Sequence, residues 1–153
     1  MQVQDIMVRD TKFCRLNNNL AAAAAIMWAN DCGGLPVLDG GGKVVGMITD
    51  RDICIAAGTR NRLPSDIQVS EVAPQKIYTC APEDDIHAAL KTMQKQKVRR
   101  LPVVGKEGKL KGILCLNDIV LNTRQGDSLS YADTVETLQA ICQHRILHRV
   151  QAA

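Results

Sequence analysis

The sequence predicts an α+β fold in which one β-α-β-β-α unit occurs twice. Three observations support this. Residues 34–52 recur at 100–118, a spacing of 66 residues with no gap. Each copy is a short apolar run, a turn, a second apolar run and a polar step into a helical segment. Hydrophobic residues make up 46% of the 153 residues but aromatic residues only 3%, so the core must be aliphatic.

The repeat extends well beyond this stretch. Residues 2–56 align with 68–122, and about 14 of the 55 pairs are identical, which is typical of one structural unit used twice. We therefore divide the chain into a first repeat (1–58), a linker (59–67), a second repeat (68–123) and a tail helix (130–150). A unit of this length has little core of its own, so we expect the repeats to pack about a pseudo-twofold axis and bury their sheet faces together.

The first repeat contains a run of five alanines, which have the highest helix propensity. Asn17, Asn18 and Asn19 precede it and supply an N-cap. The expected elements are a strand at 13–16, a helix at 20–30, strands at 35–38 and 43–49 around a turn at 39–42, and a helix at 50–57 that ends at Gly58.

The second repeat follows the same plan. The expected elements are a strand at 76–80, a helix that starts with the acidic segment 82–85, strands at 101–104 and 109–115 around a turn at 105–108, and a helix at 117–123. The apolar stripe of the first of these helices consists of Ile86, Ala89, Leu90 and Met93.

The tail at 130–150 has the pattern of an amphipathic helix. One face carries Val135, Leu138, Ile141 and Cys142, and the other carries Glu136, Gln139 and Gln143. An apolar helix face requires a partner, which is the chain's own repeats, a second subunit or another protein.

The two copies share a pair of motifs, Leu-Pro-Val followed by Gly-x-x-(Thr or Cys)-x-x-Asp. Both motifs, in this order and duplicated at one spacing, resemble the cystathionine-beta-synthase (CBS) domain, and the tandem resembles the CBS pair, or Bateman module. The resemblance covers roughly residues 1–123. It implies a regulatory module that binds AMP, ADP, ATP or a relative such as S-adenosylmethionine in two clefts between the repeats.

The resemblance also implies the residues of each cleft. The first cleft would use Met47, Thr49 and Asp52, Gln68 and Ala73 from the arm of the other repeat, and the backbone of Val98 and Arg99. The second cleft would use Ile113, Cys115 and Asp118, Gln2 and Met7 from the arm, and the backbone of Cys32 and Gly33. In the family, the aspartate binds ribose and the hydroxyl contacts ribose or phosphate.

The residues themselves are compatible with these roles. A carboxylate accepts hydrogen bonds from ribose hydroxyls, and a hydroxyl beside free helix amides binds phosphate. The alternative for Asp52 and Asp118 is simple helix capping. The sequence departs from the family pattern at Cys115, because a thiol donates a hydrogen bond poorly.

The basic pair Arg99–Arg100 favours phosphate in the second cleft, unless it is only a solvated patch. Gly33–Gly34 stands in its place in the first repeat, so the first cleft would lack a basic pair.

Other classes of function receive little support. The net charge is +3, without base-stacking aromatic residues, so nucleic-acid binding is not expected. No apolar run is long enough to span a membrane. The six cysteines contain no CxxC motif, and with no signal peptide we expect a reduced, cytoplasmic setting.

Enzymatic chemistry is not expected either, because no serine or cysteine has an identifiable histidine base and orienting acid. His144 and His148 lie one helical turn apart near Cys142, but without further ligands they indicate a polar helix end rather than a metal site. A redox role through Cys14 and Cys80 remains a third alternative.

We therefore expect a stand-alone regulatory module, not an enzyme, that binds an adenosyl ligand. We expect it to form a homodimer through its repeat helices and to regulate a protein on another chain. The main alternative is a structural or dimerisation module without bound nucleotide.

Overall fold

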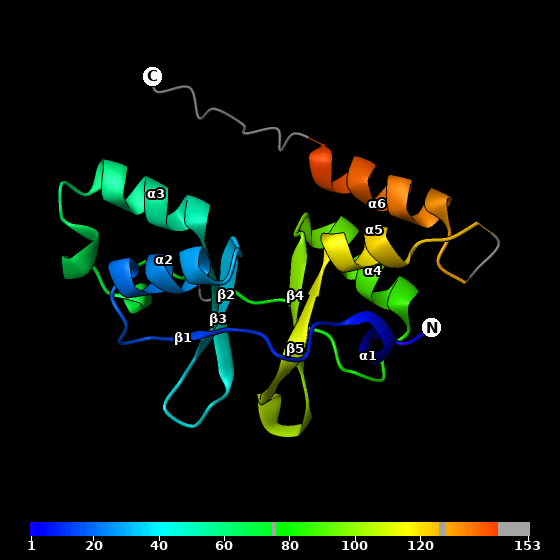
Figure 1. The fold of residues 1–153 in the computed structure, drawn as a ribbon, viewed down its shortest axis with the longest axis horizontal. Coiled ribbons are helices and arrows are strands. Elements are labelled where there is room, and N and C mark those ends of the chain that lie inside the picture. Colours follow the sequence, from blue (N-terminus) through cyan, green and yellow to red (C-terminus); the bar gives the residue numbers. More distant parts are fainter. Residues whose placement is uncertain (75, 126–127, 144–153) are drawn as a thin grey trace, which may run out of the picture.

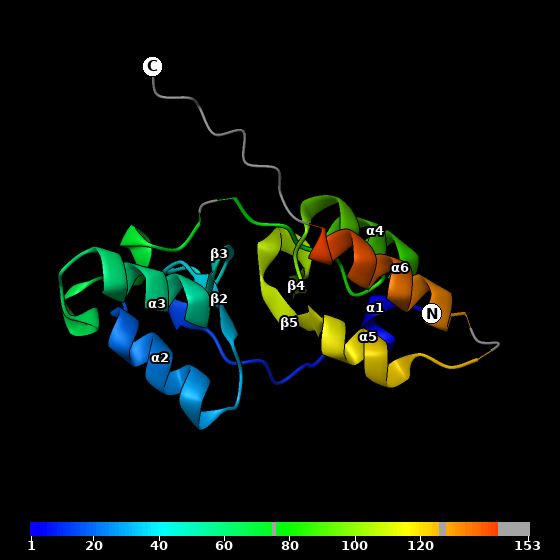
Figure 2. The same cartoon turned by 90° about the horizontal axis from the view of Figure 1, so that it is seen from above.

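The computed structural model describes residues 1–74, 76–125 and 128–143 (Figure 1). Two lobes lie side by side, and each combines a small sheet with helices (Figures 1 and 2). The helices and strands are α1 (Val3–Ile6), β1 (Cys14–Arg15), α2 (Leu20–Ala29), β2 (Gly34–Leu38), β3 (Val44–Thr49), α3 (Asp50–Thr59), α4 (Ile86–Gln96), β4 (Arg100–Val104), β5 (Leu110–Cys115), α5 (Leu116–Asn122) and α6 (Tyr131–Cys142). Short 3-10 turns are formed by Pro64–Asp66, Val69–Glu71 and Lys106–Gly108. The predicted α+β repeat is confirmed.

The backbone follows the repeat closely. In the first lobe β2 pairs with β3, and in the second lobe β4 pairs with β5, both antiparallel and in the same register. The register shifts at equivalent places, after Val37 and after Val103. The turns in the two hairpins both contain a glycine with positive φ, at Gly42 and Gly108. The gapless alignment therefore reflects two copies of one backbone.

The sheets differ in one respect. In the first lobe β1 pairs in parallel with β2, giving the strand order β1-β2-β3. The strand predicted at 76–80 does not form; only Cys80 pairs, through an isolated bridge to Val103. In the first lobe Leu16 N donates to Leu38 O at 3.3 Å, whereas the equivalent residue in the second repeat is Pro82, which has no N–H to donate.

Two helix boundaries also differ from the prediction. Gly58 does not end α3, because the helix continues to Thr59 and Arg60 N still donates to Ala56 O at 3.1 Å. The helix predicted to start within 82–85 begins at Ile86, and Asp85 caps it by accepting from His87 N at 2.9 Å. The predicted cap of α2 is confirmed, since Asn19 accepts from Ala22 N at 2.8 Å.

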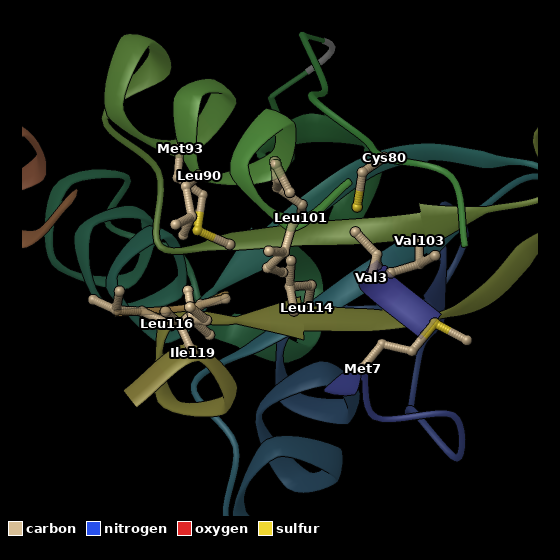
Figure 3. Close-up of a cluster of buried hydrophobic side chains, with 13 residues drawn as sticks. Val3, Met7, Cys80, Leu90, Met93, Leu101, Val103, Leu114, Leu116 and Ile119 are labelled. Carbon is tan, nitrogen blue, oxygen red and sulfur yellow. The ribbon is translucent and has the colours of Figure 1, made fainter. Parts of the chain in front are cut away.

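The arm that precedes each repeat packs into the opposite lobe. Val3 is fully buried in the core of the second lobe, and its repeat equivalent Val69 is fully buried in the core of the first. The anchoring bonds are equivalent too: Ile86 N donates to Met1 O, and Leu20 N donates to Ile67 O. Figure 3 shows Val3 on α1 among the side chains of the second lobe. Exchange of the arms ties the lobes together.

The buried side chains form two clusters, one in each lobe, rather than one shared core. The first lobe buries Cys14, Leu20, Ala23, Met27, Leu35, Val37, Ile48, Ile53, Ala56, Ile67 and Val69. The second lobe buries Val3, Met7, Cys80, Ile86, Ala89, Leu90, Met93, Leu101, Val103, Leu114, Leu116, Ile119 and Leu129. Both clusters are aliphatic as expected, and the aromatic side chains of Phe13, Trp28 and Tyr131 are exposed.

The tail helix α6 docks on α4 of its own chain (Figure 2). Its inward face was predicted only in part, because Val135 is exposed while Thr134 and Thr137 are buried. These threonines can be buried because their hydroxyls are bonded; Thr137 Oγ1 donates to Asp133 O at 2.7 Å. Leu138 packs inward as predicted, whereas Cys142 is exposed. The remainder of the predicted helix, 144–150, lies outside the described residues.

Over the described part of the chain, no helix combines the length and the apolar character that crossing a membrane requires.

Candidate functional site: two clefts between the lobes

Two hollows lie where the lobes meet. The first cleft, around Thr49 and Asp52, has a volume of about 520 Å³. The second cleft, around Cys115 and Asp118, has a volume of about 550 Å³. Each is lined by residues of both repeats, and each is of the size that holds a small-molecule ligand.

The first cleft combines an apolar slot with charged side chains. Its apolar side is lined by Met47, Pro74, Ile77, Tyr78, Val98, Pro102 and Ile141. Its polar side is lined by Thr49, Asp50, Arg51, Asp52, Lys76, Gln96, Lys97, Arg99 and Arg100. An apolar slot beside a few polar groups is the usual composition of a site for a heterocyclic ligand.

Thr49 and Asp52 form a capping box at the start of α3. Asp52 Oδ2 accepts from Thr49 N at 2.9 Å and from Thr49 Oγ1 at 2.7 Å, and Asp52 N donates to Thr49 Oγ1 at 3.2 Å. Capping and ligand binding are compatible, because the box uses Oδ2. Within the described residues Oδ1 has no hydrogen-bond donor, so it remains available as an acceptor.

The equivalent pair in the second cleft is less complete. Cys115 N donates to Asp118 Oδ2 at 2.7 Å, but the thiol does not reproduce the short bond from the Thr49 hydroxyl. Burial raises the pKa of the Asp118 carboxyl above its ordinary value, although the Cys115 N–H opposes the shift. Burial, with the nearby Asp118 charge, also raises the pKa of the Cys115 thiol to about 11. Cys115 is therefore a neutral thiol at physiological pH.

The second cleft is lined by loop residues as well as by β5 and α5. Its residues are Val8, Asp10, Thr11, Lys12, Asn30, Asp31, Cys32, Gly33, Gly34, Arg99, Arg100, Ile113, Cys115, Leu116, Asn117 and Asp118. Lys12 Nζ donates to Asp10 Oδ2 at 3.0 Å, so this cation of the second cleft is already paired with a carboxylate.

The arginine pair belongs to both clefts. Arg99 and Arg100 line each of them, whereas Gly33 and Gly34 line only the second. The expectation that the basic pair would serve only the second cleft, leaving the first without one, is therefore corrected. The placement of Arg99 in the first cleft and of Gly33 in the second agrees with the lining. The arginine side chain packs beside these glycines: a Cβ on Gly33 would lie 3.1 Å from Arg100 Nη2, a tight contact, and one on Gly34 would lie 3.5 Å from Arg100 Cδ, an ordinary one.

The two clefts differ in the balance of positive and negative side chains that line them. The first is lined by five cationic residues and two carboxylates: Arg51, Lys76, Lys97, Arg99 and Arg100 against Asp50 and Asp52. The second is lined by three of each: Lys12, Arg99 and Arg100 against Asp10, Asp31 and Asp118. The field of the first cleft favours an anion, and the second is formally neutral.

Four of the predicted site residues lie outside the lining of both clefts. Met7 is buried in the core of the second lobe, and Ala73 packs against the core of the first. Gln2 and Gln68 cap short helical turns. Their backbone N–H groups donate to the side-chain carboxylates of Asp5 and Glu71. The other predicted residues line a cleft: Met47, Thr49, Asp52, Val98, Arg99 and Arg100 the first, and Cys32, Gly33, Arg99, Arg100, Ile113, Cys115 and Asp118 the second.

The arms reach the clefts through the next residues instead, Val8 and Pro74. Val8 exchanges two backbone hydrogen bonds of 2.9 Å with Ile113. The approach at Gly112 requires glycine, because a Cβ there would lie 2.5 Å from Val8 O. At Gly46 a Cβ would lie 3.3 Å from Pro74 O, which is a tight contact rather than a clash.

Sequence reasoning missed several lining residues. Lys76 and Tyr78 line the first cleft, and their repeat equivalents Asp10 and Lys12 line the second. The gapless alignment contained the necessary signal, because these positions follow the arm that crosses between lobes. Ile141 carried no such signal, because α6 lies outside the repeat.

The other proposed chemistries gain nothing from the structure. Burial raises the pKa of the Cys14 thiol to about 11 and that of Cys80 to about 12, so both are weak nucleophiles. Among the described residues no group of three His, Cys, Asp or Glu side chains is placed to hold a metal ion. His144 and His148 lie outside the described residues.

The model of the CBS domain matches residues 3–58 and 69–122. The chain belongs to the CBS-domain family. The Bacillus subtilis protein YlbB is 31% identical over 134 residues, which cover 84% of this chain and 89% of YlbB.

Two solved structures are also similar. The CBS-domain protein TA0289 of Thermoplasma acidophilum has a TM-score of 0.77 and 26% identity, and the match covers 92% of this chain and 75% of TA0289. The CBS pair of protein MJ0100, solved in complex with 5-methylthioadenosine and S-adenosyl-L-methionine, has a TM-score of 0.72 and 25% identity; the match covers 79% of this chain and 94% of that pair.

Proposed function

We propose that this protein is a regulatory CBS pair that binds adenosyl ligands in its two clefts and performs no catalysis. The observation that carries the proposal is the placement of Asp52 and Asp118. Each carboxylate lies at the start of a helix and lines an inter-lobe cleft that the shared arginine pair also lines. That arrangement supplies a ribose acceptor, helix amides and cations together. The adenosyl ligands of the related MJ0100 pair support the same chemistry.

The charges of the clefts favour different ligands. The cation-rich first cleft suits AMP, ADP or ATP, since each phosphate finds several cations within reach. The second cleft, with balanced charge, suits an uncharged or cationic adenosyl compound such as methylthioadenosine or S-adenosylmethionine.

Isothermal titration with ATP, AMP, S-adenosylmethionine and methylthioadenosine tests the proposal. Asp52→Ala should weaken ATP binding roughly 10- to 150-fold, because hydrogen bonds to a charged acceptor contribute about 1.5–3 kcal/mol. Asp118→Ala should weaken methylthioadenosine binding by a similar factor, and each variant should leave the other cleft nearly unchanged.

Asp133→Ala is the matched control. Asp133 forms the same capping box on α6, where it accepts from Ser130 N at 2.9 Å and from Ser130 Oγ at 2.5 Å, but it lines neither cleft. All three variants lose a helix cap, so all should melt lower. Equal binding by all three would mean that Asp52 and Asp118 only cap their helices. If none of the four ligands binds the wild-type protein at millimolar concentration, the module is structural instead.

We also propose that the protein is a cytoplasmic homodimer that regulates a partner on another chain by changing shape or association. Exposed apolar side chains on the repeat helices support pairing. Ile55 on α3 and its repeat equivalent Leu121 on α5 are 50% and 79% exposed, and Trp28 on α2 is 90% exposed. Light scattering should give twice the chain mass at micromolar concentration, and a monomer mass would exclude the dimer.

A further inference from the structure

Helix α6 lies beyond the second CBS repeat, which ends at residue 122, yet one of its side chains lines the first cleft. That side chain is Ile141, in the last turn of the helix. We propose that the last turn of α6 is a third wall of the first cleft and that Ile141 contacts the bound ligand. Ligand binding there and docking of α6 would then be linked. The inference rests on the proposed function and assigns the tail helix a part in it.

The contacts of α6 fix its position on the second lobe. Gln94 Nε2 on α4 donates to Thr137 Oγ1 at 2.8 Å, and the hydroxyls of Thr123 and Thr134 lie 2.7 Å apart. Leu138 and Ile141 pack against the core of this lobe. Polar and apolar contacts therefore hold the helix along its length, with its C-terminal end at the cleft.

At the first cleft, the lining residue Lys97 is hydrogen-bonded to the end of α6. Lys97 ends α4 in the left-handed conformation, with φ of 54°, and it lines the first cleft. Its Nζ donates to Gln143 O, just after α6, at 3.1 Å. Val98, which also lines the cleft, packs against the same core as Ile141. A ligand that contacts this edge of the cleft thus meets α6 and the residues that hold it.

The second cleft offers a natural comparison. All the residues that line it belong to the repeats and their arms, and none comes from the described part of α6. Only a ligand in the first cleft should therefore affect the helix. Linkage is reciprocal: if docked α6 strengthens binding, bound ligand must stabilise docked α6 by the same factor.

Hydrogen exchange of the full-length protein with saturating ATP tests the linkage directly. Amides of residues 131–142 should exchange more slowly when ATP is bound, because local opening of the helix then requires loss of its ligand contact. The protection should persist in Asp118→Ala, whose first cleft is intact. In Asp52→Ala it should be lost when ATP is set near the wild-type Kd, because a site weakened roughly 10- to 150-fold is then mostly empty.

The side chain itself is tested with Ile141→Ala. Loss of apolar contact with a ligand should weaken ATP binding about three- to tenfold, since a buried methylene contributes about 0.8 kcal/mol and Ile141 is only partly covered. Ile141→Leu should restore most of the affinity. Val135→Ala, at an exposed position of the same helix that lines neither cleft, should change nothing.

The outcomes separate the two proposals. If ATP binds the wild-type protein with the Asp52 dependence described above, but neither the exchange of α6 nor the Ile141→Ala affinity changes, this inference is wrong and the proposed function stands. If the wild-type protein binds none of the four ligands, both are wrong.

Discussion

The two clefts have one backbone and two different chemistries. Both clefts lie where the arm of one repeat crosses to the opposite lobe. Both are also lined by an aspartate at the equivalent position in the first turn of a helix. Their lining residues have diverged in pairs. Lys76, Tyr78 and Lys97 of the first cleft stand where the second has Asp10, Lys12 and Asp31. A duplicated fold can therefore keep its geometry and still build two clefts with different charge, because side chains in a cleft contribute little to the core.

Asp31 and Lys97 illustrate the point. Both follow a helix, and both have positive φ, at 48° and 54°, so the backbone turn is the same. The carboxylate lines the second cleft and the ammonium lines the first. The turn requires a left-handed residue but not a particular charge, which leaves the charge free to suit the ligand.

The largest expected effect comes from removing the excess positive charge of the first cleft. Arg51→Gln combined with Lys76→Gln should weaken ATP binding in the first cleft roughly thirtyfold, because each partly exposed cation contributes about 1 kcal/mol to binding a phosphate. Titration calorimetry at low salt measures it. Lys12→Gln, in the second cleft, is the matched control and should leave ATP binding intact. Similar losses from both variants would show that the clefts do not differ in their preference for anions.

A smaller effect comes from exchanging the capping residues. Cys115→Thr should supply the hydroxyl that Thr49 supplies in the first cleft, raising the free energy of unfolding by about 1 kcal/mol. The melting midpoint should rise by about 2–4 °C, and methylthioadenosine should bind several-fold more tightly. Thr49→Cys should do the reverse in the first cleft.

Ser130→Cys provides a control for Cys115→Thr, since it makes the reverse change in the capping box of α6. It should lower the melting midpoint without altering methylthioadenosine binding in the second cleft. If Cys115→Thr leaves both the midpoint and the affinity unchanged, the thiol already fills the role of the hydroxyl.

The smallest effect concerns pH. Burial raises the folded-state pKa of Asp118, and the ionised carboxylate is the form that accepts from ribose. As pH falls, Asp118 should protonate earlier than an ordinary aspartate, so binding in the second cleft should weaken first. For the free protein the sign is opposite: because the folded state holds this proton more tightly, protonation of Asp118 favours folding.

Calorimetric titrations with methylthioadenosine between neutral pH and pH 5 measure this dependence. Asp118→Asn removes the titrating group and corrects for protonation of the ligand. A pH profile that is the same in both proteins would exclude Asp118 as the titrating acceptor.

The sequence by itself determined the repeat and most of the backbone. Leu35-Pro36-Val37 and Leu101-Pro102-Val103 recur at one spacing, and a conserved spacing without gaps leaves one backbone as the simplest solution. The cap Asn19, the aliphatic core and the two helix-start carboxylates followed from local chemistry. Local rules succeeded there because the partners lie within three residues of each other along the chain.

The tertiary structure decided what depends on distant segments. Arg100 lines both clefts, and its side chain packs beside Gly33 and Gly34, which lie 67 and 66 residues earlier in the sequence. The arms contribute Val8 and Pro74 to the clefts, whereas Gln2 and Gln68 are the N-caps of the helical turns that precede these residues. Ile141 reaches the first cleft only because α6 docks on α4. Packing between segments far apart in sequence determines which residues share a cleft, and no local pattern encodes that packing.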